Sequence, residues 1–169
     1  MSSENSFDTT IKRLTLEQLD TYLFRYKGKN AGIQRIYGGQ VIAQAYVAAN
    51  ATIEDDKHLH SLHAYFLRPG IIKQPVLFSV DPVRNGRSFS TRTVKAIQNN
   101  EVIFTMTVSF QKDEEGFTHS IEMPKVPAPE EIKDEIEMRK ENIDKVPEEI
   151  RHYFLKEREY SIKWVESVS

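Results

Sequence analysis

Three histidines, His58, His60 and His63, lie close together in a run of residues that reads as a β-strand ended by Pro69 and Gly70. Imidazole titrates near neutrality, so each ring is able to act as a general base or as a hydrogen-bond donor. Because side chains alternate across a strand, we expect His58 and His60 on one face and His63 on the other. That split and the absence of cysteine argue against zinc, and no metal is expected.

The stretch from Tyr37 to Ala49 reads as one alanine-rich apolar helix, and two glycines stand where it begins. The first N–H groups of a helix are unpaired, and the helix dipole favours negative charge there. We therefore expect Gly38, Gly39 and Gln40 to bind substrate, with the amides of Gly39 and Gln40 facing a carbonyl oxygen. The alternative is a tight loop in which the glycines serve packing only.

Several cations near the ends of the predicted strands are candidates for contact with phosphate groups. Arginine suits this role because its planar guanidinium matches phosphate geometry, and Arg68 is the preferred candidate. The plainer interpretation is a set of solvated side chains at strand ends. The other candidates are Arg84, Arg87, Arg92 and Lys95.

The elements that must position these residues follow from hydrophobic periodicity. A helix that is apolar on every side is expected to be buried on every side. Strand-like runs precede and follow it, and a curved antiparallel sheet wrapped around the one helix is the simplest arrangement, which is the hot-dog architecture of the α+β class. The runs are residues 21–26, 58–67, 74–84, 88–98 and 101–112.

Local signals refine these elements. The last strand is the clearest, because alternate residues from Val102 to Phe110 are apolar and should lie on the helix. Asn85-Gly86 and Asn99-Asn100 read as turns between strands. Thr15 to Gln18 fits a capping box and predicts a short helix that starts at Thr15.

The composition changes after Lys112. Residues 1–112 are expected to form the sheet domain, and residues 113–159 a proline- and charge-rich linker with short helices. Tyr160, Ile162 and Trp164 alternate with other residues, which predicts a new strand. We interpret residues 160–169 as the start of a second, truncated domain; the alternative is an edge strand of the first sheet.

The totals exclude several classes of protein. The chain has 169 residues and a net charge of -2, which argues against a nucleic-acid partner. No run approaches the roughly 18 apolar residues that span a bilayer, so no membrane span is expected. Cysteine is absent, which excludes disulfides and thiolate catalysis.

Four motifs resemble the acyl-CoA thioesterase II family, which includes bacterial enzymes and the peroxisomal thioesterases of eukaryotes. The motifs are YGGQVIAQA at 37–45, HSLHAYFLRPG at 60–70, GRSFSTR at 86–92 and VSFQ at 108–111. The resemblance implies two hot-dog domains per chain, with a catalytic Asp, Ser or Thr, and Gln in the second, so these have no counterparts here. It also implies that His60 reaches the pocket between the domains in a supporting catalytic role.

The first functional hypothesis is therefore the N-terminal half of a hydrolase that cleaves fatty acyl-CoA without a cofactor, in fatty acid metabolism. The second is a non-catalytic module that binds another hot-dog domain, and we expect a homodimer because an isolated sheet exposes an edge. The third, an enoyl-thioester hydratase, is disfavoured because it needs an Asp near the start of the central helix, and none occurs between Asp20 and Asp55. A peroxisomal location is implied by the resemblance alone.

Overall fold

The computed structural model describes residues 6–28, 35–54, 56–155 and 161–165. The chain divides into two compact units, Met1–Gly116 and Phe117–Ser169. The first unit contains the predicted sheet and central helix, and the second contains short helices.

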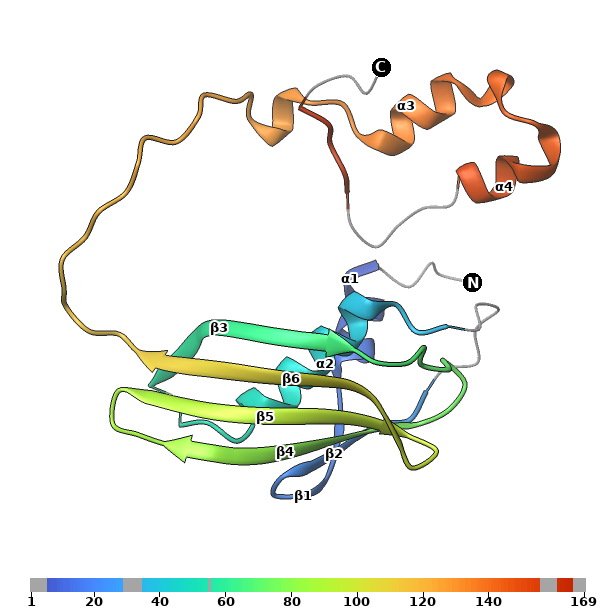
Figure 1. Ribbon diagram of the computed structural model, residues 1–169. Coiled ribbons are helices and arrows are strands. Elements are labelled where there is room, and N and C mark those ends of the chain that lie inside the picture. The colour runs from blue at the N-terminus through green and yellow to red at the C-terminus, as the bar shows by residue number, and fades with distance from the viewer. Residues whose placement is uncertain (1–5, 29–34, 55, 156–160, 166–169) are drawn as a thin grey trace. The chain divides into compact units, whose positions relative to one another are not determined.

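The first unit is a six-stranded antiparallel sheet with one helix against its inner face (Figure 1). The strands follow the order β1-β2-β4-β5-β6-β3, so β1 and β3 form the edges. The helices are α1 (Ser6–Leu14) and α2 (Gly38–Asn50), and the strands are β1 (Glu17–Asp20), β2 (Leu23–Tyr26), β3 (Lys57–Phe66), β4 (Val76–Asn85), β5 (Phe89–Gln98) and β6 (Glu101–Lys112). The predicted sheet around a central helix is confirmed.

The core lies between α2 and the middle of the sheet. Ala45 and Ala48 of α2 are fully buried and belong to one apolar cluster with Phe78 of β4, Val94 of β5 and Met106 of β6. Alanine in the helix allows the strands to approach closely. The predicted inner face of β6 is confirmed, because its alternate residues from Phe104 to Phe110 are buried.

The β5–β6 hairpin has the predicted two-residue turn. Asn99 and Asn100 both have positive φ angles, 49° and 63°. A two-residue hairpin that matches the twist of its strands requires this left-handed conformation, and asparagine tolerates it better than most residues. The turn fixes the register in which β5 and β6 pair.

The helix predicted to start at Thr15 is wrong. α1 ends at Leu14, and the hydroxyl of Thr15 donates a hydrogen bond back to the Ile11 carbonyl at 2.9 Å rather than capping a new helix. Glu17 instead begins strand β1 and accepts hydrogen bonds from Arg25 of β2. Tertiary pairing between two short strands therefore overrides the local capping signal.

The expectation that the central helix is buried on every side is also wrong. Five residues of the helix are buried, packed on the sheet and on α1: Val41, Gln44, Ala45, Ala48 and Ala49. Another side of the helix is only half-buried, because within this unit the sheet covers only part of the helix surface. The half-buried side chains are Ile42, Ala43, Tyr46 and Val47.

The second unit contains an extended segment and short helices. Residues 117–128 form no helix or strand. The helical elements that follow are η1 (Pro129–Glu131), α3 (Glu135–Glu141), η2 (Ile143–Lys145), η3 (Glu148–Ile150) and α4 (Arg151–Phe154). These short helices lie within the predicted linker, residues 113–159, of which residues 156–159 fall outside the described part.

The strand predicted from Tyr160 is not formed in the described residues 161–165. Lys163 makes one isolated antiparallel bridge with Asp134, and Tyr160 itself lies outside the described residues. Asp134 also caps α3 by accepting a hydrogen bond from the Ile136 amide at 2.9 Å. The returning chain therefore closes the small helical unit and does not extend a sheet.

Candidate functional site

The start of α2 presents backbone donors, as the sequence suggests. Tyr37 precedes the helix with extended backbone angles, φ −66° and ψ 131°, and its side chain makes no capping hydrogen bond. No hydrogen bond between described residues uses the amide N–H of Gly38 or of Gly39. The Gln40 amide differs, because it donates to the Tyr37 carbonyl at 3.0 Å. The first two amides are therefore the ones that can meet a ligand.

A cavity of about 340 Å³ opens beside this helix start. Gly38 lines it together with Arg68, so the fold brings these two predicted site residues to one place. Gly39 and Gln40 are not among the lining residues. The walls are otherwise mainly apolar, and the sequence did not single them out because such residues look like ordinary core: Ile36, Val41, Phe66, Leu67, Pro69, Gly70, Ile103 and Phe104.

Both glycines are closely packed. A Cβ atom on Gly38 would lie 3.0 Å from the Phe66 ring, and one on Gly39 would lie 2.5 Å from the Tyr37 ring. Aromatic rings therefore occupy the space that side chains would take at the first two helical positions. Glycine at these two positions leaves room for the aromatic rings and also lets a ligand approach the backbone.

Arg68 stands at the rim of this cavity. Its Nη1 donates to the Val102 carbonyl at 2.8 Å, and its Nε lies 3.5 Å from a carboxylate oxygen of Glu101. About half of the side chain is exposed. The guanidinium is thus fixed by the β5–β6 hairpin and still reaches solvent, which allows contact with an anionic group.

Gln40 has a buried side-chain amide that lacks a partner. Its Nε2 makes no hydrogen bond with the described residues, and neither does Oε1 of the fully buried Gln44 one turn later. A donor and an acceptor are therefore both unsatisfied along one side of α2. A water molecule or a ligand amide would satisfy such groups.

His60 lies elsewhere in the fold. The β3–β6 register shifts between Leu59 and Ser61, so His60 occupies a β-bulge. Its ring packs edge-on against Phe89 at 5.7 Å between centroids, and its Nδ1 lies 3.2 Å from the Ser61 hydroxyl. Phe89 pairs with Gln111, next to the buried Phe110, so His60 lies on the outer face of the sheet.

The bulge corrects the predicted faces of the three histidines. His58 pairs with Gln111 and His63 with Thr107, and both partners lie on the outer face. His63 therefore shares a face with His58 and His60, because the extra residue in the bulge reverses the alternation beyond it. No group of three metal-ligating side chains is close enough to hold an ion in the described part of the chain.

The structure separates His60 from the start of α2. Phe66, which packs on Gly38, is six residues farther along β3. His60 and Phe66 are therefore about 20 Å apart along β3, at roughly 3.3 Å per residue. The two side chains also lie on opposite faces of the sheet. His60 is exposed, so a group supplied from outside this unit can reach it.

Arg92 is a structural residue and not a phosphate ligand. It is only 2% exposed, and its guanidinium donates to the Thr52 hydroxyl and carbonyl, both at 2.8 Å, and to the Arg84 and Thr91 carbonyls, both at 3.0 Å. Burial lowers the pKa of Arg92 from its ordinary value, because the charged form loses solvation. The cation ties the segment after α2 to the sheet.

Comparison with known proteins agrees with this architecture. Residues 27–111 match the family model for the acyl-CoA thioesterase N-terminal domain. This chain belongs to the acyl-CoA thioesterase family. The thioesterase domain match begins in the loop before α2 and ends in β6, so it includes the start of α2, Arg68 and His60.

Relatives of known name extend the match. Acyl-CoA thioesterase 2 of Haemophilus influenzae is 41% identical over 153 residues, which cover 90% of this chain and 54% of the relative. Acyl-coenzyme A thioesterase 8 of Homo sapiens is 46% identical over 122 residues, which cover 72% of this chain and 38% of the relative. This chain thus spans about half or less of the length of these relatives.

Solved structures show the same fold. Acyl-CoA thioesterase II TesB2 from Mycobacterium marinum superposes with a TM-score of 0.65 and 40% identity, covering 72% of this chain and 45% of that one. A protein from Alicyclobacillus acidocaldarius described as having a hot dog fold superposes with a TM-score of 0.64 and 26% identity, covering 75% and 48%. The predicted hot-dog fold of this thioesterase family member is confirmed.

Proposed function

We propose that this chain is the N-terminal half of an acyl-CoA thioesterase, which hydrolyses fatty acyl-CoA to a free fatty acid and coenzyme A. The observation that carries the proposal is the match of residues 27–111 to an N-terminal thioesterase domain, in a chain that spans 54% of its bacterial relative. On this proposal residues 160–169 lead into a second hot-dog domain, which supplies the catalytic Asp, Ser or Thr, and Gln.

In this proposal the first domain holds the substrate. The mainly apolar cavity beside Gly38 suits an acyl chain or the apolar part of the pantetheine arm, and Arg68 at its rim suits an anionic group. In this proposal the unpaired amides of Gly38 and Gly39 stabilise the thioester oxygen as it becomes negative. The Gln40 side-chain amide is a further donor, once a ligand reaches it.

The reaction needs no cofactor. An activated water adds its oxygen to the thioester carbonyl carbon, and its proton passes to a base. The tetrahedral intermediate collapses, the carbon–sulfur bond breaks, and the sulfur of coenzyme A takes up a proton. His60 lies about 20 Å from the amides of Gly38 and Gly39 on the opposite face of the sheet, so it does not contact the same carbonyl. Its proposed supporting role is to position a group of the second domain on that outer face.

Hydrolysis of a long-chain acyl-CoA, followed by thiol release, tests the proposal. The folded 169-residue chain should be inactive, while a chain that carries both halves should turn over. In the latter, His60→Ala should lower turnover with little change in melting temperature, because the side chain is exposed and makes few contacts. His58→Ala, on the same strand, is the matched control. Activity of the 169-residue chain alone would contradict the half-enzyme proposal.

An assembly module is the second candidate, and the free edge of β3 favours it. Three apolar residues of β3 lie on the inner face, opposite buried residues of β6, and are nevertheless exposed. They are Leu59, Leu62 and Phe66, which are 43%, 39% and 56% exposed. An edge strand with an exposed apolar row is a site for pairing with another sheet. We propose that a second hot-dog domain covers this row, and that two copies of this chain form a homodimer when no second domain is present.

Sedimentation of the 169-residue chain at tens of micromolar tests the homodimer. Leu62→Asp should shift the chain to monomer, because the charge would be buried at the interface. His63→Asp, the adjacent residue on the outer face, should leave the dimer intact. A monomeric wild-type chain, or equal effects of the two substitutions, would exclude dimerisation through this row.

A peroxisomal location is proposed for the parent protein. The support is a relative named peroxisomal acyl-coenzyme A thioester hydrolase 1, from Saccharomyces cerevisiae, which is 32% identical over 79 residues. Fluorescence microscopy of the full-length protein beside a peroxisomal marker tests it, and a diffuse signal would contradict it. Among the described residues, no helix is long and apolar enough to cross a membrane.

A further inference from the structure

The cavity beside the start of α2 has one wall that differs from the rest of its lining. Most of the apolar lining belongs to the buried core, including Ile36, Val41 and Phe104. Phe66 lines the same cavity and is 56% exposed. It stands on β3, an edge strand that pairs only with β6. A substitution at Phe66 therefore alters the cavity at less cost to the core than one at Phe104.

The ring of Phe66 contacts the start of α2 on one side and the sheet on the other. A Cβ on Gly38 would lie 3.0 Å from the ring, and the three atoms nearest to that Cβ all belong to Phe66. On the sheet side, the ring centroid lies 5.1 Å from that of Phe104. Phe66 and Phe104 are partners in the β3–β6 ladder, so the register of the strands fixes this contact. The ring thus links the free amides of the helix start to the buried part of the lining.

Another part of the lining has little room to adapt. A Cβ on Gly70 would lie 3.1 Å from Cδ1 of both Ile36 and Ile103, so these two side chains already close on the Gly70 backbone. The Arg68 amide donates to the Ile103 carbonyl at 3.1 Å, which fixes the chain where β3 ends. A ligand that needs more space in the cavity is therefore expected to find it at Phe66.

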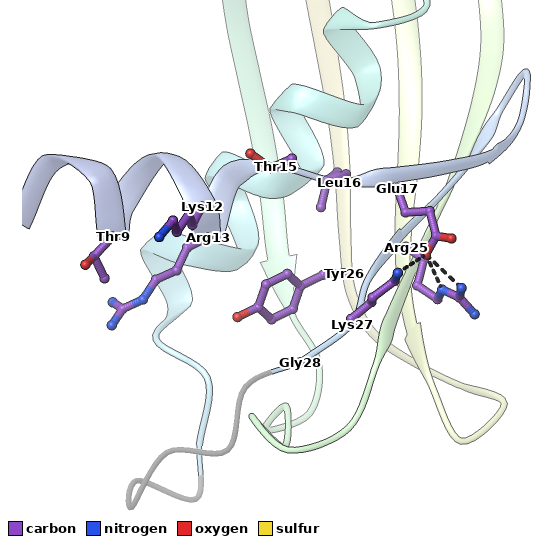
Figure 2. Close-up of a pocket in the computed structure, with 10 residues that line it drawn as sticks. All are labelled: Thr9, Lys12, Arg13, Thr15, Leu16, Glu17, Arg25, Tyr26, Lys27 and Gly28. Atoms are coloured by element: carbon purple, nitrogen blue, oxygen red, sulfur yellow. Dashed lines mark hydrogen bonds and ion pairs between the residues drawn. The ribbon is translucent and has the colours of Figure 1, made fainter. Parts of the chain in front are cut away.

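A larger pocket of the first unit does not suit an acyl chain. It lies between α1, β1 and β2 (Figure 2), has a volume of about 640 Å³ and shares no lining residue with the cavity beside Gly38. Methylene groups gain little from contact with ionised side chains, which lose solvation when they are covered. Half of the ten residues drawn in Figure 2 are charged: Lys12, Arg13, Glu17, Arg25 and Lys27. The mainly apolar cavity beside Gly38 is thus the better place for an acyl chain.

Phe66 also belongs to the exposed apolar row of β3, together with Leu59 and Leu62. Of these three residues, Phe66 is the one that lines the cavity. The second hot-dog domain that is proposed to cover this row would close over the exposed side of the ring and leave the other side to the substrate. Leu59 therefore offers a matched control, because it shares the exposed row and not the cavity.

We propose that Phe66 sets the length of the acyl chain that this cavity accepts. The inference rests on the proposed function, because it takes the substrate to be a fatty acyl thioester whose carbonyl lies at the amides of Gly38 and Gly39. An acyl chain that enters the cavity from there meets the Phe66 ring, which contacts Gly38. One methylene group more or less in a hydrophobic pocket changes specificity about tenfold or more. A smaller side chain at this position therefore admits a longer acyl chain, and a larger one admits a shorter chain.

Hydrolysis of octanoyl-CoA and hexadecanoyl-CoA by a chain with both halves tests the proposal, with thiol release giving kcat/KM for each substrate. Phe66→Ala should raise the ratio of kcat/KM for the long over the short substrate about tenfold or more, and Phe66→Trp should lower it by a similar factor. Phe66→Leu is a milder change that should move the ratio in the same direction as alanine, with less risk to the fold. Leu59→Ala should leave the ratio within about twofold of wild type, even where it lowers both rates, because it lies outside the cavity.

An unchanged ratio in Phe66→Leu and Phe66→Trp would overturn the proposal, as would an equal change in Leu59→Ala. A chain with both halves that cleaves neither substrate would instead overturn the proposed function.

Calorimetric titration of the folded 169-residue chain with octanoate and hexadecanoate tests Phe66 without any turnover. The affinity for hexadecanoate relative to octanoate should rise in Phe66→Leu and fall in Phe66→Trp. No binding of either acid, or a relative affinity that does not respond to Phe66, would overturn the assignment of the cavity to the acyl chain.

Discussion

Replacing Arg92 by methionine should destabilise the sheet unit strongly. The guanidinium lies at the segment that follows α2 and donates to the Thr52 carbonyl and hydroxyl and to the Arg84 carbonyl. No carboxylate forms an ion pair with it in the described part of the chain, so its hydrogen bonds compensate for burial of the charge. Methionine keeps much of the apolar volume and removes every donor.

The size of the effect follows from the groups left behind. Each part-buried carbonyl that loses its donor costs about 1 kcal/mol or more, and the carbonyls of Thr52, Arg84 and Thr91 each lose one. Removal of a buried cation offsets part of this loss, since a charge without a carboxylate partner is costly to bury. We expect a net loss of about 3 kcal/mol. With a urea m-value of about 2 kcal/mol/M, the midpoint falls by about 1.5 M.

Urea unfolding followed by circular dichroism in the strand region measures this shift. Arg87→Met is the matched control, because Arg87 is exposed, and its midpoint should move by less than about 0.3 M. The urea midpoint of Arg92→Lys should lie between those of Arg92→Met and Arg87→Met, since an ammonium cannot reproduce the planar set of donors. Equal midpoints for Arg92→Met and Arg87→Met would refute the assignment of Arg92 as an anchor of α2.

Three further substitutions test other parts of the first unit. Gly28→Ala should lower the free energy of unfolding by about 2 kcal/mol, because its φ of +81° is strained for any residue with a side chain. Gly116→Ala is the control and should be neutral in the same urea assay, because no atom lies within 4 Å of its added Cβ. Gln98→Glu should lower the thermal midpoint by several degrees, because the buried amide donates to two backbone carbonyls that a carboxylate would repel. A hydrogen bond from Arg25 holds the pKa of Glu17 below its ordinary 4.5, so its contribution to stability is present above that pH and is lost as the pH falls below it. Between about pH 6 and pH 3.5, the Glu17→Gln variant should therefore lose less of its free energy of unfolding than the wild type does. Equal losses would contradict the ion pair between Glu17 and Arg25.

Periodicity predicted the main strands because each buries one face against the same helix. The alternation from Val102 to Phe110 locates β6, and the asparagines at 99 and 100 mark its turn, because both signals depend on neighbours in the chain. The short strand β1 was missed for the opposite reason. Its four residues become a strand only through pairing with β2, and the local signal at Thr15 favours a helix.

The candidate site was partly predictable. Gly38, which the sequence places at the start of the apolar helix, lines a cavity, and Arg68 reaches the same cavity from the end of β3. No local pattern predicts that Lys12, Arg13 and Lys27 line one pocket. They look like scattered surface charges until α1 and β2 are placed side by side.

Short-range patterns in the sequence identify the long strands, the central helix and the motifs that resemble the family, because each of these features depends on neighbours in the chain. The tertiary structure alone decided which faces and ends meet. One extra residue at His60 reverses the faces of the rest of β3, since alternation has a period of two and a bulge adds one. The half-buried side of α2 is likewise a property of the packed unit, because burial depends on what lies against a helix and not on its composition.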